Sequence, residues 1–172
     1  MDLLDHLTQE HREAEALVEQ LAETDPGQER NRLVDELTQA LHQHMEVEEQ
    51  FLYPIVRDEL GKEDAFEGNI EHQLAREGLE KLHELRDKPG FAAALDMVKA
   101  GITHHVEDEE GEMFPELREK AADRIAGLDP EKLEGMIDLT KDQMYRQATE
   151  AGIEGRSDMT RDELARTLAE QA

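Results

Sequence analysis

Two short stretches of the sequence carry histidine and glutamate at spacings that suit metal binding. Residues 44–54 read HMEVEEQFLYP and residues 105–115 read HVEDEEGEMFP. Each stretch begins with His, has Glu at the fourth and fifth positions after it, and ends in Pro. Side chains four residues apart in an α-helix lie about 40° apart around the helix axis. The His and the first Glu of each stretch could therefore form a surface ion pair or bind one metal ion.

The two stretches belong to a longer internal repeat. A constant offset of 61 residues relates three pairs of candidate ligands, namely His11 and His72, His44 and His105, and Glu48 and Glu109. The sequences that begin at Glu10 (EHREAEALVEQL) and at Glu71 (EHQLAREGLEKL) are similar as well. The chain therefore reads as a tandem helical hairpin, with one His on the first helix of each copy and His-x-x-x-Glu on the second.

The elements that must position these residues are helices. Apolar residues recur at steps of three and four within residues 3–23, 29–56, 65–87 and 90–117. Asp25 and Pro26 are predicted to cap and begin the second helix, Gly61 to end it, and DKPG to separate the last two. Four long helices with short connections predict an all-α, antiparallel up-down-up-down four-helix bundle. Pro54 and Pro115 should each bend or end a helix.

The spacing also predicts that the six candidate ligands share one level of the bundle. Paired candidates are equally distant from the turn that joins their helices, and antiparallel helices rise equally per residue. Four imidazoles and two carboxylates buried together would be costly without compensation, and a metal centre supplies it. Nitrogen and oxygen ligands without sulfur suit iron, manganese or zinc, and two carboxylates suit a pair of ions.

These residues resemble the ligands of the hemerythrin-like, His-His-Glu cation-binding domain, and the resemblance covers about residues 1–125. It rests on His11, His72 and the two His-x-x-x-Glu motifs with their FLYP and EMFP endings. The resemblance implies a non-haem di-iron centre, in which the metal ligands are His11 and His44 on one iron, His72 and His105 on the other, and Glu48 and Glu109 as bridges.

Four further residues are candidates for a role beside the metal: Glu49, Glu110, Arg76 and Tyr53. Oxygen-carrying hemerythrins have another histidine one turn after the third-helix ligand, where this chain has Arg76. We therefore do not expect reversible oxygen carriage, and we expect the charge of Arg76 to favour an anionic ligand. Tyr53 and Phe114 correspond across the repeat and are expected to pack against the site. The remaining histidines, at 6, 42, 83 and 104, have no partner 61 residues away and are not predicted to be ligands.

The composition disfavours several kinds of partner and of location. The net charge of −25 arises from 44 acids and 19 bases spread along the chain, which disfavours nucleic-acid and anionic-membrane partners. There is no cysteine, no long apolar run and no secretory start, so we expect a soluble cytoplasmic protein. Rival motifs are weaker, since only Glu80 and His83 fit the Glu-x-x-His of ferritin-type bundles.

After the repeat, the sequence predicts a separate C-terminal part. We divide the chain into residues 1–127, the bundle, and residues 128–172, a helical extension that should be dispensable for folding. Gly127 should end one helix, Pro130 should begin another that extends to residue 151, and Thr160 with Glu163 should cap a final one. Residues 140–170 resemble the Rho-terminator N-terminal type of helical motif, which is associated with nucleic-acid proteins. With six bases and eleven acids, residues 128–172 favour a protein partner instead.

Three functions fit the sequence. The first is a protein that binds iron and a small ligand (oxygen, nitric oxide or peroxide) in sensing or in redox and iron homeostasis. The second is a di-iron peroxidase or oxidase that protects against oxidative stress. The third is a structural protein with a vestigial site.

Overall fold

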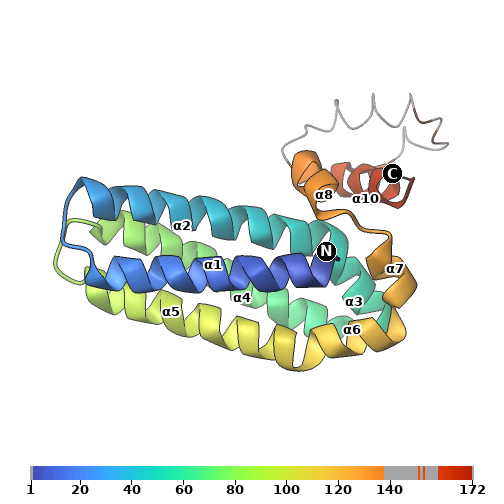
Figure 1. The fold of residues 1–172 in the computed structure, drawn as a ribbon, viewed down its shortest axis with the longest axis horizontal. Helices are drawn as coiled ribbons and strands as arrows, with labels where there is room; N and C mark the ends of the chain where they lie inside the picture. The colour runs from blue at the N-terminus through green and yellow to red at the C-terminus, as the bar shows by residue number, and fades with distance from the viewer. Residues whose placement is uncertain (1, 138–150, 152, 154–158, 172) are drawn as a thin grey trace.

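The computed structural model describes residues 2–137, 151, 153 and 159–171, and its body consists of four long helices that run side by side (Figure 1). They are α1 (Leu3–Glu23), α2 (Gln28–Val47), α4 (Lys62–Leu85) and α5 (Phe91–Asp108). Each helix packs against two others, in the cyclic order α1, α2, α4, α5. Every regular element in the described ranges is helical, which confirms the predicted all-α bundle. None of the described helices is long and apolar enough to cross a bilayer.

The apolar spacing of α1 explains how a helix directs a histidine inward. Asp2 caps the helix by accepting a 2.9 Å hydrogen bond from the backbone N–H of Asp5. The buried residues then follow at steps of three and four: Leu3, Leu4, Leu7, His11, Ala14, Val18 and Leu21. Leu7 belongs to an apolar cluster at one end of the bundle and Ala14 to a second cluster at the other end. His11 therefore lies between two apolar cores.

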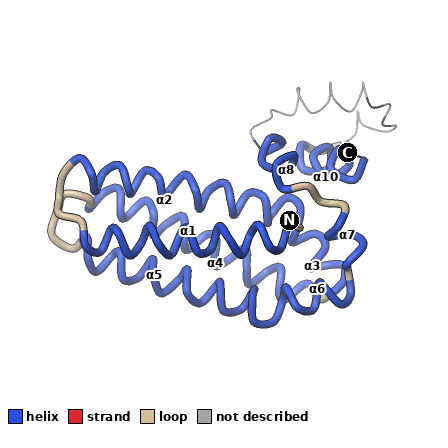
Figure 2. Tube along the Cα trace, viewed as in Figure 1, coloured by secondary structure: helices blue, strands red, loops and turns tan. Residues whose placement is uncertain are grey.

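Short turns join the long helices, and two of them lie at the same end of the bundle (Figure 2). The prediction that Asp25 caps α2 and Pro26 begins it is wrong. Gly27 is the cap, with a φ of 143°, and the helix begins at Gln28. Glycine is favoured there because other residues rarely adopt this φ. Gly61 has a φ of 152° and donates its N–H to the carbonyl of Val56 at 3.0 Å, so it ends the preceding helix as predicted.

The helices that carry the two glutamates do not end at the prolines. Each passes through one wider π-helical turn, η1 (Glu48–Leu52) and η2 (Glu109–Met113), and continues as α3 (Tyr53–Glu59) and α6 (Phe114–Lys120). In these turns a backbone N–H bonds to the carbonyl five residues earlier, and the proline that follows has no N–H to offer. The expected bend or end is thus a local widening that begins at each glutamate.

The remaining described helices cover one end of the bundle: α7 (Ala122–Ala126), α8 (Pro130–Ile137) and α10 (Arg161–Gln171). The predicted stop at Gly127 and start at Pro130 are confirmed, and so is the cap, since the N–H of Glu163 donates to Thr160 Oγ1 at 3.2 Å. Positions 138–150 of the predicted helix, and much of the Rho-type motif, lie outside the described residues.

The proposed boundary at residue 127 crosses a continuous apolar core. The cluster at this end of the bundle contains Leu4, Phe51 and Ile55 from the bundle, together with Leu133 of α8 and Leu164 of α10. The extension therefore buries apolar residues of the bundle.

Candidate metal centre

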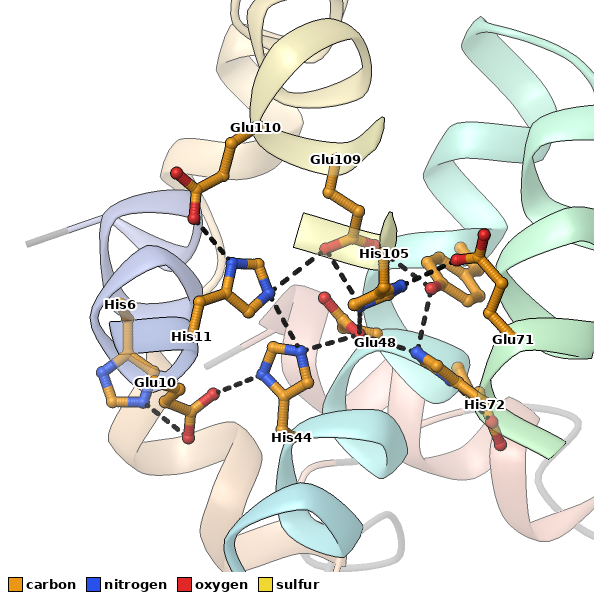
Figure 3. Close-up of polar contacts among 12 residues, drawn as sticks. His6, Glu10, His11, His44, Glu48, Glu71, His72, His105, Glu109 and Glu110 are labelled. Atoms are coloured by element: carbon orange, nitrogen blue, oxygen red, sulfur yellow. Dashed lines mark hydrogen bonds and ion pairs between the residues drawn. The ribbon is translucent and has the colours of Figure 1, made fainter. Parts of the chain in front are cut away.

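All six predicted ligands converge inside the bundle (Figure 3). None is more than 9% exposed, and Glu48 is completely buried. They come from four helices and the two π turns: His11 from α1, His44 from α2, Glu48 from η1, His72 from α4, His105 from α5 and Glu109 from η2. The six residues therefore lie at one level of the bundle, as the positions of the turns predicted.

The imidazoles lie in two pairs with the carboxylates between them. The Nε2 atoms of His11 and His44 are 3.2 Å apart, and the rings of His72 and His105 have centroids 5.0 Å apart. Glu48 Oε2 lies 3.1 Å from Nε2 of both His44 and His72, and so it spans the two pairs.

Glu109 spans the pairs in the same way. Its Oε2 is 3.5 Å from Nε2 of both His11 and His105. Five of the six residues, all except His72, each offer one ligand atom within 4.8 Å of the others, and His72 joins them through Glu48.

Each imidazole is held in one orientation by a carboxylate on its outer side. The Nδ1 contacts are His11 to Glu110 at 2.8 Å, His44 to Glu10 at 2.9 Å, His72 to Glu49 at 2.9 Å, and His105 to Glu71 at 3.0 Å. A carboxylate accepts hydrogen bonds, so Nδ1 carries a hydrogen, and in the neutral ring Nε2 offers its lone pair to the centre. Such partners fix the ring of a metal-binding histidine and raise its basicity.

The sequence interpretation proposed Glu49 and Glu110 as accessory residues but missed Glu10 and Glu71. A signal for them was present, because Glu10 and Glu71 are related by the same 61-residue offset and each directly precedes a candidate ligand. The repeat thus extends from the six central residues to the four carboxylates around them.

The buried charges need a cation. Burial raises the pKa of Glu48, but interactions with His44, His105 and His72 outweigh burial and hold this pKa well below its ordinary value. Burial lowers the pKa of His44, yet the charges of Glu48 and Glu10 outweigh it and raise the pKa to about 10. Burial and the neighbouring Glu48 raise the pKa of Glu109. In the metal-free chain, His44 therefore keeps its proton at neutral pH beside Glu48.

Four buried atoms of the centre lack a hydrogen-bond partner, namely both carboxylate oxygens of Glu48, Oε2 of Glu109 and Nε2 of His105. Unsatisfied buried polar atoms are rare in folded proteins and are costly. All four are atoms that could bind a metal ion, and they belong to the residues that converge in the centre. The residues present therefore fit bound metal.

Tyr53 and Phe114 flank the centre as predicted, and they make it asymmetric. The Tyr53 ring stacks on His72 at 5.2 Å between centroids, and the Phe114 ring stacks on His11 at 6.0 Å. Only Tyr53 brings a hydroxyl, whose oxygen is 3.1 Å from both His72 Nε2 and Glu109 Oε1. A Cβ on Gly68 would lie 2.5 Å from that oxygen, so glycine leaves room for the tyrosine.

Arg76 lies beside the centre and pairs with one of the outer carboxylates. Its Nη1 donates to Glu49 Oε1 at 2.8 Å, on the outer side of His72. Arg12 pairs with Glu110 in the same way on the outer side of His11. Both guanidinium groups therefore neutralise carboxylates that hold histidines, and the expectation that Arg76 favours an anionic ligand stays a prediction.

The other histidines are not among the six converging residues, although His6 and His104 lie 3.6 and 3.5 Å from the outer carboxylates of Glu10 and Glu71. His6 Nε2 contacts Glu134 of α8 at 2.6 Å, and His83 Nε2 lies 3.0 Å from the hydroxyl of Thr38. The side chain of His104 is 65% exposed.

The fold and the site together define a metal-binding helical bundle, in which histidines and glutamates from all four long helices meet in a buried centre. The chain belongs to the hemerythrin family: the profile described as Hemerythrin HHE cation binding domain matches residues 2–117. The resemblance stated from the motifs is thereby confirmed. A comparison with curated proteins gave no match, and a comparison with solved structures gave none either.

Proposed function

We propose that the chain holds two non-haem iron ions and binds a small ligand, namely oxygen, nitric oxide or peroxide, in sensing or in redox and iron homeostasis. The proposed ligands are one histidine pair for each ion with Glu48 and Glu109 as bridges. The proposal includes a cytoplasmic location, which the cysteine-free sequence suits.

The observation that carries this proposal is the orientation of the imidazoles. Four outer carboxylates direct four Nε2 lone pairs toward two buried carboxylates that have unsatisfied oxygens. Six donors in two equivalent sets exceed what a single ion needs from the protein, and nitrogen and oxygen donors suit iron. A vestigial site would have no reason to keep all four outer contacts.

A cavity beside the histidines favours a small ligand. It has a volume of about 70 Å³ and lies between the four long helices, lined on its apolar side by Ala14, Ala40, Ala75, Gly101, Ile102 and Val106. Benzene occupies an engineered cavity of about 150 Å³, so this space suits a molecule of two or a few atoms rather than a ring.

Tyr53 supports the enzymatic alternative, a di-iron peroxidase or oxidase. When bound, a pair of ferrous ions would supply two electrons, the number that converts one hydrogen peroxide to two waters. That reaction also consumes two protons, which solvent would supply. Burial and the charges of Glu109 and Glu48 raise the pKa of Tyr53 far above its ordinary value, so its hydroxyl stays protonated and acts as a hydrogen-bond donor, here to Glu109 at the edge of the centre.

Reconstitution of the metal-free chain with ferrous iron under anaerobic conditions tests the proposal. We expect two irons per chain by elemental analysis, and their loss in His44→Ala and Glu109→Ala. His42→Ala, on the same helix as His44, is the matched control and should keep both irons. One tightly held zinc without any iron would contradict the proposal.

Turnover separates the two functions. In a binding or sensing protein, one equivalent of peroxide should oxidise the iron once, whereas an enzyme should consume peroxide continuously when a reductant is supplied. Tyr53→Phe, which copies Phe114, should slow continuous turnover and leave the iron content unchanged.

A further inference from the structure

A second cavity reaches the centre from solvent, and its walls are acidic. It has a volume of about 150 Å³ and lies between α4 and the segment formed by α5, η2 and α6. Its outer part is lined by five exposed carboxylates, those of Asp64, Glu67, Asp108, Glu112 and Glu116, and its inner part by Glu71, His105 and Glu109. We call this cavity the acidic cleft.

The inner wall of the acidic cleft carries unsatisfied ligand atoms. Glu109 Oε2 and His105 Nε2 are buried and have no hydrogen-bond partner. Figure 3 shows Glu71 beside His105, on the side of the cluster opposite to Glu10. Glu71 holds Nδ1 of His105 at 3.0 Å, so the histidine at the inner end of the cleft has a fixed orientation. The inner end of the cleft is therefore lined by two residues of the centre.

The outer carboxylates are largely without cationic partners. In the described part of the chain, no lysine or arginine forms an ion pair with Asp64, Glu67 or Glu112, whereas Glu116 pairs with Lys120. Beside the cleft, Glu71 and Asp108 lie with the exposed His104 so that one ligand atom of each falls within 4.8 Å of the others. Donors for a cation thus occur both in the outer part of the cleft and at its inner end.

The repeat shows that this acidity is not a requirement of the fold. In the first copy, the positions that correspond to Asp64, Gly68, Asp108, Glu112 and Glu116 hold the apolar residues Leu3, Leu7, Val47, Phe51 and Ile55. All five are buried in the cluster that α8 and α10 share. The equivalent face is therefore closed by apolar packing, and only the second copy keeps it open and charged.

The other approaches to the centre are less suited to a cation. The cavity beside the histidines has a mainly apolar surface, although Glu10, Glu13 and Glu71 also line it. On the outer sides of His11 and His72, Arg12 and Arg76 neutralise the carboxylates of Glu110 and Glu49, so these carboxylates attract a cation less.

From this geometry we infer that the acidic cleft is the path by which ferrous iron reaches the buried centre, while neutral small ligands use the apolar cavity. The inference rests on the proposed function, because it takes the centre to hold iron. A charged cleft with low-dielectric walls raises the local concentration of counter-ions and increases association rates about 10- to 1,000-fold.

Rates of metal uptake test the inference. Metal-free full-length protein is mixed anaerobically with ferrous iron, or with cobalt(II) as a second probe, and binding is followed by absorbance. The cleft variant combines Asp64→Asn, Glu67→Gln, Glu112→Gln and Glu116→Gln. The control variant combines Glu63→Gln, Glu77→Gln, Glu107→Gln and Glu119→Gln, four exposed acids on the same helices outside the cleft. Both lose four negative charges.

We expect the cleft variant to take up metal at least 10-fold more slowly at low ionic strength, by the focusing argument above. The control should change less than threefold, and both should reach the wild-type final content. The difference should shrink in about 0.5 M salt, where the Debye length is only a few ångströms. Glu112→Lys should slow uptake more than Glu107→Lys, and thermal unfolding shows whether each variant is folded.

Equal uptake rates in the folded cleft and control variants overturn the inference and leave the proposed function intact. A lower final content in the cleft variant also overturns it, because these residues would then hold the metal rather than conduct it. Wild-type protein that takes up no iron overturns both proposals.

Discussion

Gly68→Ala tests how tightly the structure places Tyr53 against the centre. The added Cβ would lie 2.5 Å from Tyr53 Oη and 2.6 Å from its Cζ. Ordinary contacts require about 3.5 Å, so the ring must move by roughly 1 Å. This shift breaks the 3.1 Å contacts of the hydroxyl with Glu109 and His72.

The size of the effect follows from two opposing contributions. Losing a hydrogen bond to a charged group costs about 1.5–3 kcal/mol. Replacing a glycine inside a helix by alanine recovers about 1 kcal/mol. The net loss is about 0.5–2 kcal/mol, which for a protein of this size lowers Tm by about 1–8 °C.

The matched control is Gly101→Ala, in the interior of α5. A Cβ there meets nothing within 4 Å, so only the helix preference acts. We expect Tm of this variant to rise by about 2–4 °C.

Thermal unfolding of the metal-free protein, followed by circular dichroism, measures both variants. Combining Gly68→Ala with Tyr53→Phe should cost less than the sum of the two single changes, because both remove the same hydrogen bond. If Gly68→Ala is as stable as the wild type, and the double variant is as stable as Tyr53→Phe alone, this placement of the tyrosine is refuted.

Three further results are expected. Glu10 and Glu71 hold histidine rings, so Glu10→Gln and Glu71→Gln should each weaken iron binding about 10- to 100-fold in equilibrium dialysis. The exposed Glu13→Gln is the control and should leave the affinity unchanged. Equal affinities in all three variants would contradict the role of Glu10 and Glu71. In metal-free protein the pKa of His44, raised from 6.5 to about 10, gives a stabilisation that is complete below pH 6.5 and is lost as the pH rises toward 10. Tm should therefore fall between pH 7 and pH 10, and a flat profile would count against the charged histidine. Removal of residues 128–172 should expose the shared apolar cluster and cause aggregation, which light scattering would detect. This result would differ from the expectation that residues 1–127 fold alone. A soluble fragment with unchanged Tm would support that expectation instead.

The sequence predicted much of the fold because its signals were local or repeated. The apolar periodicity indicated residues 3–23 as a helix, and α1 has those bounds. The start of α2 and its cap were each misplaced by two residues. A Pro-Gly pair marks a reversal, but which residue adopts the positive φ depends on how the two helices pack.

The π turns show a different limit. The prolines at 54 and 115 indicated an interruption of the backbone hydrogen bonds in each helix, and the sequence predicted that the helix bends or ends there. The packed bundle instead keeps both helices continuous and widens them at the glutamates. Local sequence shows where a backbone bond is missing, whereas the surrounding packing decides how the helix accommodates the loss.

By itself, the sequence determined which residue types recur at 61-residue intervals and on which helical faces they lie, because repetition and periodicity are properties of the chain. Only the tertiary structure decided which carboxylate holds which imidazole. The His11–Glu110 contact joins residues 99 positions apart, and no local pattern encodes it. The two copies also acquire different surroundings: one packs against the C-terminal helices and the other faces solvent through the acidic cleft. The asymmetry of the centre therefore arises from packing between distant segments, which a symmetric repeat cannot specify.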